Sequence, residues 1–230
     1  MRVQRWKPGV VIILMVTIKQ FNIQPHLESL CQGLDELGLS LSEEVMEQIF
    51  AHLQIMQKWN QRLNLTAVTQ TEDMINYHVL DSLVIEPFIK GSRVLDIGTG
   101  GGFPGIPLAL ANPDRQYTLL DSRGKRIEFL RFVKGKLGLD QVELVNNRVE
   151  NYQPLEKFDT LVTRAFSSVG QLLQLTSHLS GPGTRVLAMK GRYPESELEQ
   201  LPELTKSRMT IEKLNVPGLG QDRHLIIIDF

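Results

Sequence analysis

The stretch that most constrains this fold is residues 94–109, VLDIGTGGGFPGIPLA, where an apolar run meets a glycine-dense turn and a second apolar segment. Four of the five positions from Gly98 to Gly102 are glycine. Glycine has no Cβ and adopts positive φ readily, so such a turn lets a ligand approach the main chain. A helix that follows directs its free N–H groups back toward the turn. We therefore predict a buried strand, a ligand-binding turn and a helix.

From residue 93 onward, strand-like and helix-like segments alternate. The predicted strands are 93–97, 116–120, 142–145, 160–163, 185–189, 210–214 and 225–229, and the predicted helices are 103–111, 125–137, 169–179 and 195–204. Short connections of this kind imply right-handed crossovers and a parallel sheet covered on both faces. Only a Pro/Gly-containing turn separates the last two strands, which predicts a hairpin. The expected fold is α/β and Rossmann-like, a mostly parallel seven-stranded sheet with an antiparallel C-terminal hairpin, similar to class I methyltransferases.

Residues 24–88 have a helical pattern. Ser40 and Glu43 predict a capping box at the start of the second of three helices. A polar turn at 60–70 is expected to lead into the third helix, around 72–88.

The first residues superficially resemble a signal peptide, because the apolar run 10–18 follows Arg2, Arg5 and Lys7. That run is far shorter than the ~20 residues needed to cross a bilayer. No small-residue cleavage site follows it. We expect a disordered or weakly docked extension, or an upstream start with Met15 as the alternative first residue.

Composition excludes several function classes. A single cysteine, Cys31, rules out a disulfide framework and a Cys-rich metal site, which fits a reducing compartment. We therefore expect a cytoplasmic protein without a metal ion. With a net charge of −1, a nucleic-acid partner would have to be met by a local basic patch.

The glycine turn is compatible with two kinds of ligand. The spacing Gly100-x-Gly102-x-x-Gly105 matches the dinucleotide pattern, which places a pyrophosphate over the turn. However, Asp96 stands two residues before Gly98, and a carboxylate beside a pyrophosphate is unfavourable. S-adenosylmethionine carries an ammonium and a sulfonium instead of phosphates, so the D-x-G-x-G-x-G form favours this cofactor, with Gly98 and Gly100 close to it.

Further cofactor contacts are expected after the next strands. Asp121 ends the second strand, where an acid accepts hydrogen bonds from a ribose diol; it would also suit the N-cap of the next helix. The segment 148–150 follows the third strand, beside the expected adenine, and could equally be a surface loop. The segment 163–166 follows the fourth strand and lacks the Asn/Asp-Pro-Pro-aromatic motif of adenine and cytosine amino methyltransferases. Cytosine C5 methylation is disfavoured as well, because Cys31 lies outside the catalytic domain.

Several strings together resemble the RsmG (GidB) family of bacterial 16S rRNA guanine-N7 methyltransferases. They are WNQRLNLT at 59–66, HVLDSL at 78–83, the run 96–109, DSRGKRIEFL at 121–130, RVE at 148–150, TRA at 163–165 and MKG at 189–191. The resemblance covers the chain from about His26 on. It implies S-adenosylmethionine as cofactor and a guanine near the decoding site of 16S rRNA as substrate. Carried over by motif, it implies cofactor contacts at Gly98, Phe103, Val149, Glu150 and Arg164, with Asp121 as a further one.

RNA contacts require basic side chains. We predict them at Arg123, Lys125, Arg126, Lys190 and Arg192. A charge run is more often a solvated helix face, but the family resemblance favours RNA contacts at Arg123, Lys125 and Arg126.

Five other polar or aromatic residues have alternative interpretations. His78 and Asp81 could contact substrate, but a satisfied polar packing pair is the commoner arrangement. Asn60 and Asn64 suit a structured turn. The helical spacing of Trp59 places it in the core rather than against a base.

The sequence thus predicts direct in-line methyl transfer from S-adenosylmethionine to guanine N7, with no catalytic residue named, because N7 already carries a lone pair. The weaker alternatives are a small-molecule methyltransferase, an NAD-linked oxidoreductase and a non-catalytic RNA-binding module. We expect a monomer that binds 16S rRNA or the small ribosomal subunit and no membrane. Its expected parts are the extension 1–22, a helical element 23–90 and a methyltransferase domain 91–230.

Overall fold

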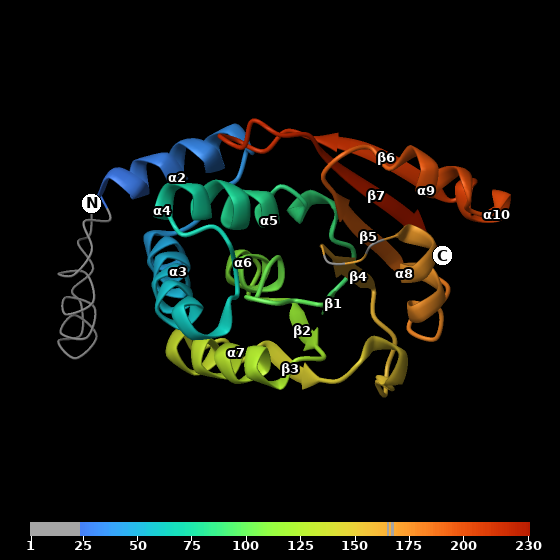
Figure 1. Ribbon diagram of the computed structural model, residues 1–230, viewed down its shortest axis with the longest axis horizontal. Helices are drawn as coiled ribbons and strands as arrows, with labels where there is room; N and C mark the ends of the chain where they lie inside the picture. The colour runs from blue at the N-terminus through green and yellow to red at the C-terminus, as the bar shows by residue number, and fades with distance from the viewer. Residues whose placement is uncertain (1–23, 165, 167) are drawn as a thin grey trace.

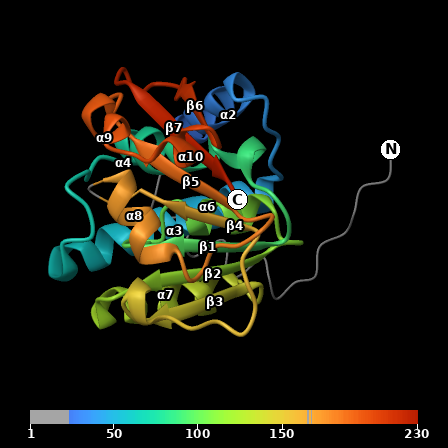
Figure 2. The same cartoon turned by 90° about the vertical axis from the view of Figure 1, so that its right-hand side faces the viewer.

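The computed structural model describes residues 24–230 apart from 165 and 167, so the predicted extension 1–22 lies outside the described residues. Its centre is a seven-stranded sheet in the order β3-β2-β1-β4-β5-β7-β6 (Figure 2). The strands are β1 (Arg93–Ile97), β2 (Gln116–Asp121), β3 (Val142–Asn146), β4 (Thr160–Thr163), β5 (Arg185–Lys190), β6 (Met209–Leu214) and β7 (Arg223–Asp229). Only β7 runs antiparallel to its neighbours β5 and β6. The predicted mostly parallel sheet with a C-terminal hairpin is confirmed.

Helices cover both faces of this sheet (Figure 1). The N-terminal ones are α2 (Gln24–Glu36), α3 (Glu43–Leu63), α4 (Thr71–Met74), the π-helical η1 (Ile75–Leu80), α5 (Asp81–Leu83) and the 3-10 turn η2 (Glu86–Phe88). Those between strands are α6 (Gly105–Ala111), α7 (Gly124–Leu137), the 3-10 turn η3 (Val149–Asn151), α8 (Val169–Thr176), α9 (Glu195–Glu199) and α10 (Glu203–Lys206). Among the described residues, no helix combines the length and apolarity that a membrane crossing requires.

The strands separate two hydrophobic clusters, one on each face of the sheet. Successive residues of β1 alternate between them: Val94 joins the cluster that includes residues of α6 and α7, and Leu95 joins the cluster beneath α8 and α9. Both faces are buried, as expected when parallel strands are joined through helices.

The N-terminal helices share the first of these clusters. Leu53 and Met56 of α3 and Leu80 of η1 belong to the same buried group as Ile106 of α6 and Phe129 of α7. The helical element therefore packs directly against the helices of the sheet domain and shares its core.

Two local predictions about the helical element are wrong. The residue that caps α3 is Ser42, whose hydroxyl accepts a hydrogen bond from Val45 N at 3.3 Å; Ser40 lies two residues too early, and no capping box forms. The polar turn also begins at Asn64 rather than at residue 60, because α3 continues to Leu63.

The predicted helix 195–204 is divided in two. Its halves are α9 and α10, and Pro202 stands at the N-cap of α10. Proline has no N–H and disfavours helical geometry in the residue before it, so one continuous helix cannot form through this position.

Candidate active site

The residues predicted to bind the cofactor come together at one edge of the sheet. Gly98 follows β1, Asp121 ends β2, Val149 and Glu150 follow β3, and Arg164 follows β4. These four strands are adjacent and parallel, so their carboxyl ends meet at the same edge. Ligands of open α/β sheets bind at this edge.

The glycine turn is held by main-chain hydrogen bonds and by positive φ angles. Gly98, Gly100 and Gly102 have φ values of 74°, 59° and 89°, which other residues rarely adopt. Gly98 N donates to Leu120 O at 2.8 Å, which fixes the turn to the end of β2. A Cβ at Gly102 would lie 2.7 Å from a side-chain carbon of Ile106. A Cβ at Gly100 would meet nothing nearer than 3.9 Å, so the side of the turn that a ligand can approach lies at Gly100.

Asp121 ties this turn to β2 and α7. Its Oδ2 accepts from Gly100 N and from Arg126 Nη1, both at 3.0 Å, and its Oδ1 accepts from Arg123 N at 2.8 Å. The N-cap residue of α7 is Arg123, so the alternative prediction that Asp121 is the N-cap is wrong. A carboxylate offers about four lone-pair sites, so Asp121 keeps capacity for one more donor, such as a ribose hydroxyl.

Asp96 lies beneath the turn and is fully buried. Its Oδ2 accepts from the N–H of Gly105, the first residue of α6, at 2.9 Å. Burial raises the pKa of Asp96 to about 6, against the opposing effects of the Thr99 hydroxyl and the Gly105 N–H. Asp96, which favoured S-adenosylmethionine over a dinucleotide in the sequence, thus joins the end of β1 to the start of α6.

Phe103 is held between two buried histidines. Its ring centroid lies 4.8 Å from those of His52 and His78, and the guanidinium of Arg164 lies 5.7 Å from it. His52 Nε2 donates to Gly101 O at 2.8 Å, so the sandwich also supports the glycine turn. Burial lowers the pKa of each histidine to about 4, and both are therefore neutral at pH 7. The Phe103 side chain is buried, so only its main chain could make the cofactor contact expected at this position.

The string at 59–66 folds a loop that positions His78. Asn60 bonds the main chain of Thr66 twice, once as donor and once as acceptor, each at 2.9 Å, and Asn64 has φ 48°. Thr66 Oγ1 lies 2.8 Å from His78 Nε2, while His78 Nδ1 lies 3.0 Å from Tyr77 O. Since a carbonyl can only accept, Nδ1 carries the proton and Nε2 accepts from Thr66. Asn64 lies in the turn, as predicted, whereas Asn60 belongs to α3 and bonds the turn through its side chain. Trp59 packs against the core, as predicted.

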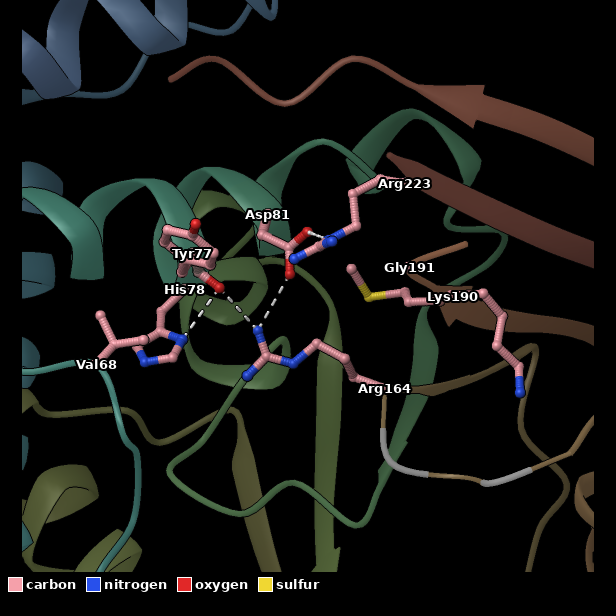
Figure 3. A pocket seen from close by; sticks show the side chains of 9 residues that line it. Val68, Tyr77, His78, Asp81, Arg164, Lys190, Gly191 and Arg223 are labelled. Atoms are coloured by element: carbon pink, nitrogen blue, oxygen red, sulfur yellow. Dashed lines mark hydrogen bonds and ion pairs between the residues drawn. The ribbon is translucent and has the colours of Figure 1, made fainter. Parts of the chain in front are cut away.

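A pocket of about 310 Å³ lies beside Arg164, and we call it the Arg164 pocket (Figure 3). Its lining includes Tyr77, His78, Asp81, Arg164, Met189 and Arg223. Asp81 is buried and accepts from Arg164 Nη1 at 3.2 Å and from Arg223 Nε at 2.8 Å. His78 and Asp81 do not bond to each other; each has other partners, and both line the pocket.

The sequence analysis missed Tyr77 and Arg223. Arg223 opens β7 and reaches Asp81 only because β7 returns antiparallel beside β5. Tyr77 belongs to the π-helical η1. Neither residue belongs to a motif quoted above.

A second pocket, of about 320 Å³, lies between the end of α3 and the start of α7 and is basic. Its lining includes Arg62, Arg123, Lys125 and Arg126. Three of the predicted RNA-binding residues are therefore neighbours, and the structure adds Arg62. We call this the Arg62 pocket.

The two remaining predicted RNA-binding residues differ from each other. Lys190 Nζ contacts both carboxylate oxygens of Glu197, at 2.9 and 3.1 Å, and its side chain is only 12% exposed. Arg192 is exposed. A role of Lys190 in binding RNA would require its ammonium to leave Glu197.

Comparison with known proteins identifies the family and supports this description of the fold. The GidB family, described as rRNA small subunit methyltransferase G, matches residues 45–226. "Ribosomal RNA small subunit methyltransferase G" of Coxiella burnetii (strain Dugway 5J108-111) is 46% identical over 199 residues, 86% of this chain and 96% of that protein. The same-named protein of Ectopseudomonas mendocina is 47% identical over 207 residues, which are 89% of this chain and 96% of that protein.

Solved structures share the fold at lower identity. An O-methyltransferase from Bacillus cereus has a TM-score of 0.55 and 21% identity, over 78% of this chain and 91% of that one. A putative O-methyltransferase from Klebsiella pneumoniae has a TM-score of 0.55 and 20% identity, over 78% of this chain and 90% of that one. The chain therefore has the class I methyltransferase fold and belongs to the GidB family, the rRNA small subunit methyltransferases G.

Proposed function

We propose that this protein, an S-adenosylmethionine-dependent rRNA methyltransferase, methylates N7 of a guanine in the decoding-region loop of 16S rRNA. The observation that supports this most is the position of Arg164. Its guanidinium lies over Phe103 of the glycine turn and also lines the Arg164 pocket. A cofactor edge and a pocket for an acceptor thus meet at one side chain.

The residues at the cofactor edge fit S-adenosylmethionine. The turn is open at Gly100, where a bulky ligand can approach the main chain. Asp121 has capacity for a ribose hydroxyl, and Val149 of η3 adds a nearly buried apolar side chain after β3. We propose that Gly98, Gly100, Asp121 and Val149, with Phe103, Glu150 and Arg164, hold the cofactor.

The chemistry requires little from the protein beyond position. The cofactor supplies a methyl group on a sulfonium, and guanine N7 attacks with a free lone pair, so no proton has to leave first. The two histidines near the pocket are neutral and buried, and both ring nitrogens of His78 already have partners. The chain's residues would therefore hold the base in line and keep water out. Orientation alone supplies up to ~7–11 kcal/mol in ideal cases.

Modification mapping tests the substrate. 16S rRNA from a deletion strain should lack one N7-methylguanine, and incubating that rRNA with the purified protein and S-adenosylmethionine should restore it. An unchanged modification map would reject the proposed substrate.

Thermal-shift titration tests the cofactor edge. S-adenosylmethionine or S-adenosylhomocysteine should stabilise the protein and NAD should not. Gly98→Asp should abolish that stabilisation, because it adds bulk and charge at a residue with φ 74°. Wild-type cofactor affinity in this variant would remove the turn from the site.

A further inference from the structure

We propose that the Arg164 pocket receives the target guanine, turned out of the rRNA, and that Arg223 and Arg164 recognise its O6. This inference rests on the proposed function and assigns the acceptor half of the same site. It makes Arg223 a specificity-determining residue, although it lies 59 positions beyond Arg164.

Sheet order places the pocket next to the cofactor edge. The predicted cofactor residues follow β3, β2, β1 and β4, in that spatial order. The pocket continues along the sheet, with Arg164 after β4, Met189 and Lys190 at the end of β5, and Arg223 at the start of β7. Since Arg164 is common to both sets, a base in this pocket lies beside the cofactor.

The pocket offers hydrogen-bond donors in excess, because both Asp81 oxygens and the Tyr77 carbonyl already accept from side chains that line it. Asp81 Oδ1 and Oδ2 accept from Arg223 and Arg164, and Tyr77 O accepts from both His78 and Arg164 (Figure 3). The two guanidiniums have five N–H donors each and only some of them are engaged. A base that presents an acceptor to the two guanidiniums is therefore favoured over one that presents an amino group to them.

Guanine satisfies this requirement and adenine does not. On the major-groove edge guanine carries two neighbouring acceptors, O6 and N7, whereas adenine carries an amino group beside N7. N7 must keep its lone pair for the methyl group, so the arginines can bind O6 only. A donor on O6 then leaves N7 directly beside it, accessible from the side of Arg164 and the cofactor.

The pocket walls suit a flat base and are held in place. Tyr77 and Met189 provide aromatic and apolar surface, and the Tyr77 hydroxyl accepts from Gln221 Nε2 at 3.1 Å. The volume of about 310 Å³ is at the small end of ligand pockets. Asp81 fixes both guanidiniums before any ligand binds, which reduces the entropy lost on recognition.

Base analogues at the target position test the assignment in the wild-type protein. Inosine keeps O6 and N7, whereas 2,6-diaminopurine keeps N7 but replaces O6 with an amino group. In rRNA substituted at that single base, we expect inosine to be methylated within about fivefold of guanine and diaminopurine at least tenfold more slowly. Equal rates for the two analogues would overturn the inference, because O6 would then not be recognised.

Arg223→Gln tests the residue itself, because glutamine offers both a donor and an acceptor. We expect a tenfold or greater loss of kcat on guanine, a smaller difference between inosine and diaminopurine, and unchanged affinity for S-adenosylhomocysteine, which also reports correct folding. Arg208→Gln, an exposed arginine outside both pockets, is the matched control and should behave as wild type.

Two other outcomes separate the hypotheses. An Arg223→Gln variant that only weakens rRNA binding, with unchanged discrimination between the analogues, would mean that the pocket holds a phosphate and would refute the inference. If the wild-type protein fails to methylate N7 of unmodified 16S rRNA, the proposed function itself fails.

Discussion

Asp81→Asn should destabilise the protein by about 2–3 kcal/mol. The carboxylate side chain is 2% exposed and bonds two arginines, Arg164 at 3.2 Å and Arg223 at 2.8 Å. Asparagine keeps the volume and one acceptor oxygen, but its amide NH₂ would face one of the guanidiniums. The variant therefore removes the charge that balances two cations and leaves one without an acceptor.

The magnitude follows from the exposure of the three partners. Removing one member of a buried ion pair costs about 3–5 kcal/mol, whereas exposed pairs contribute ~0.2–1 kcal/mol. The side chains of Arg164 and Arg223 are 30% and 17% exposed, so water partly solvates them when the carboxylate is gone. The expected loss of unfolding free energy therefore lies between the values for an exposed and a buried ion pair, nearer the value for a buried one.

Equilibrium urea unfolding measures this cost as a shift of the midpoint at constant slope. Asp222→Asn is the matched control, because it breaks the exposed Asp222–Lys213 pair, whose side chains are 59% and 72% exposed, and it should cost less than about 1 kcal/mol. Equal losses for the two variants, or a loss below about 0.5 kcal/mol for Asp81→Asn, would refute the argument. A two-arginine anchor of the Arg164 pocket would then have no energetic basis.

Three further predictions concern the turn and the basic pocket. The free energy of unfolding, measured by urea titration, should fall by roughly 3 kcal/mol as the pH drops from 6.5 to 4. The unfolded chain then protonates the two histidines around Phe103, whose folded pKa values are about 4, and the raised pKa of Asp96 offsets about half of the resulting loss. A constant free energy of unfolding over this pH range would contradict the prediction. Gly105→Ala should cost about 1–3 kcal/mol in thermal or urea unfolding, because its Cβ would lie 2.1 Å from a side-chain carbon of β2, while Gly135→Ala, with open space in α7, should be neutral or stabilising. Arg62→Gln should weaken rRNA binding and lower the slope of log K against log salt by about 0.7–0.9, and an unchanged slope would exclude a phosphate contact there.

The strands and the glycine turn were predictable because their signals are local. An apolar run bounded by turn residues identifies a buried strand, and the end of each parallel strand marks the ligand edge. For β1 and β4 the predicted and observed bounds coincide. Gly98, Asp121, Val149 and Arg164 could thus be brought together without knowledge of any side-chain position.

The Arg164 pocket could not be predicted in this way. Arg223 meets Asp81 across 142 residues, and that contact depends on the register of the antiparallel β7 against β5. The helix cap shows the same difficulty at short range: Ser40 and Ser42 both stand near the start of α3, and the hydrogen bond to Val45 decides between them. In both cases the sequence analysis missed the residue that matters, Arg223 or Ser42, and a contact in the folded structure identifies it.

The arrangement around Arg164 gives the two halves of the proposed site one shared support. Its guanidinium bonds Asp81 and the main chain of Tyr77 on the pocket side and lies over the ring of Phe103 on the turn side. Phe103 in turn is fixed between His52, which bonds Gly101 of the turn, and His78, which the 59–66 loop positions. In-line transfer requires acceptor and donor atoms to be aligned closely, and a rigid chain of contacts from the glycine turn to the pocket supplies that alignment more reliably than two sites supported separately. The strings at 59–66 and 78–83 are therefore structural supports of the site, whether or not any of their side chains contacts the substrate.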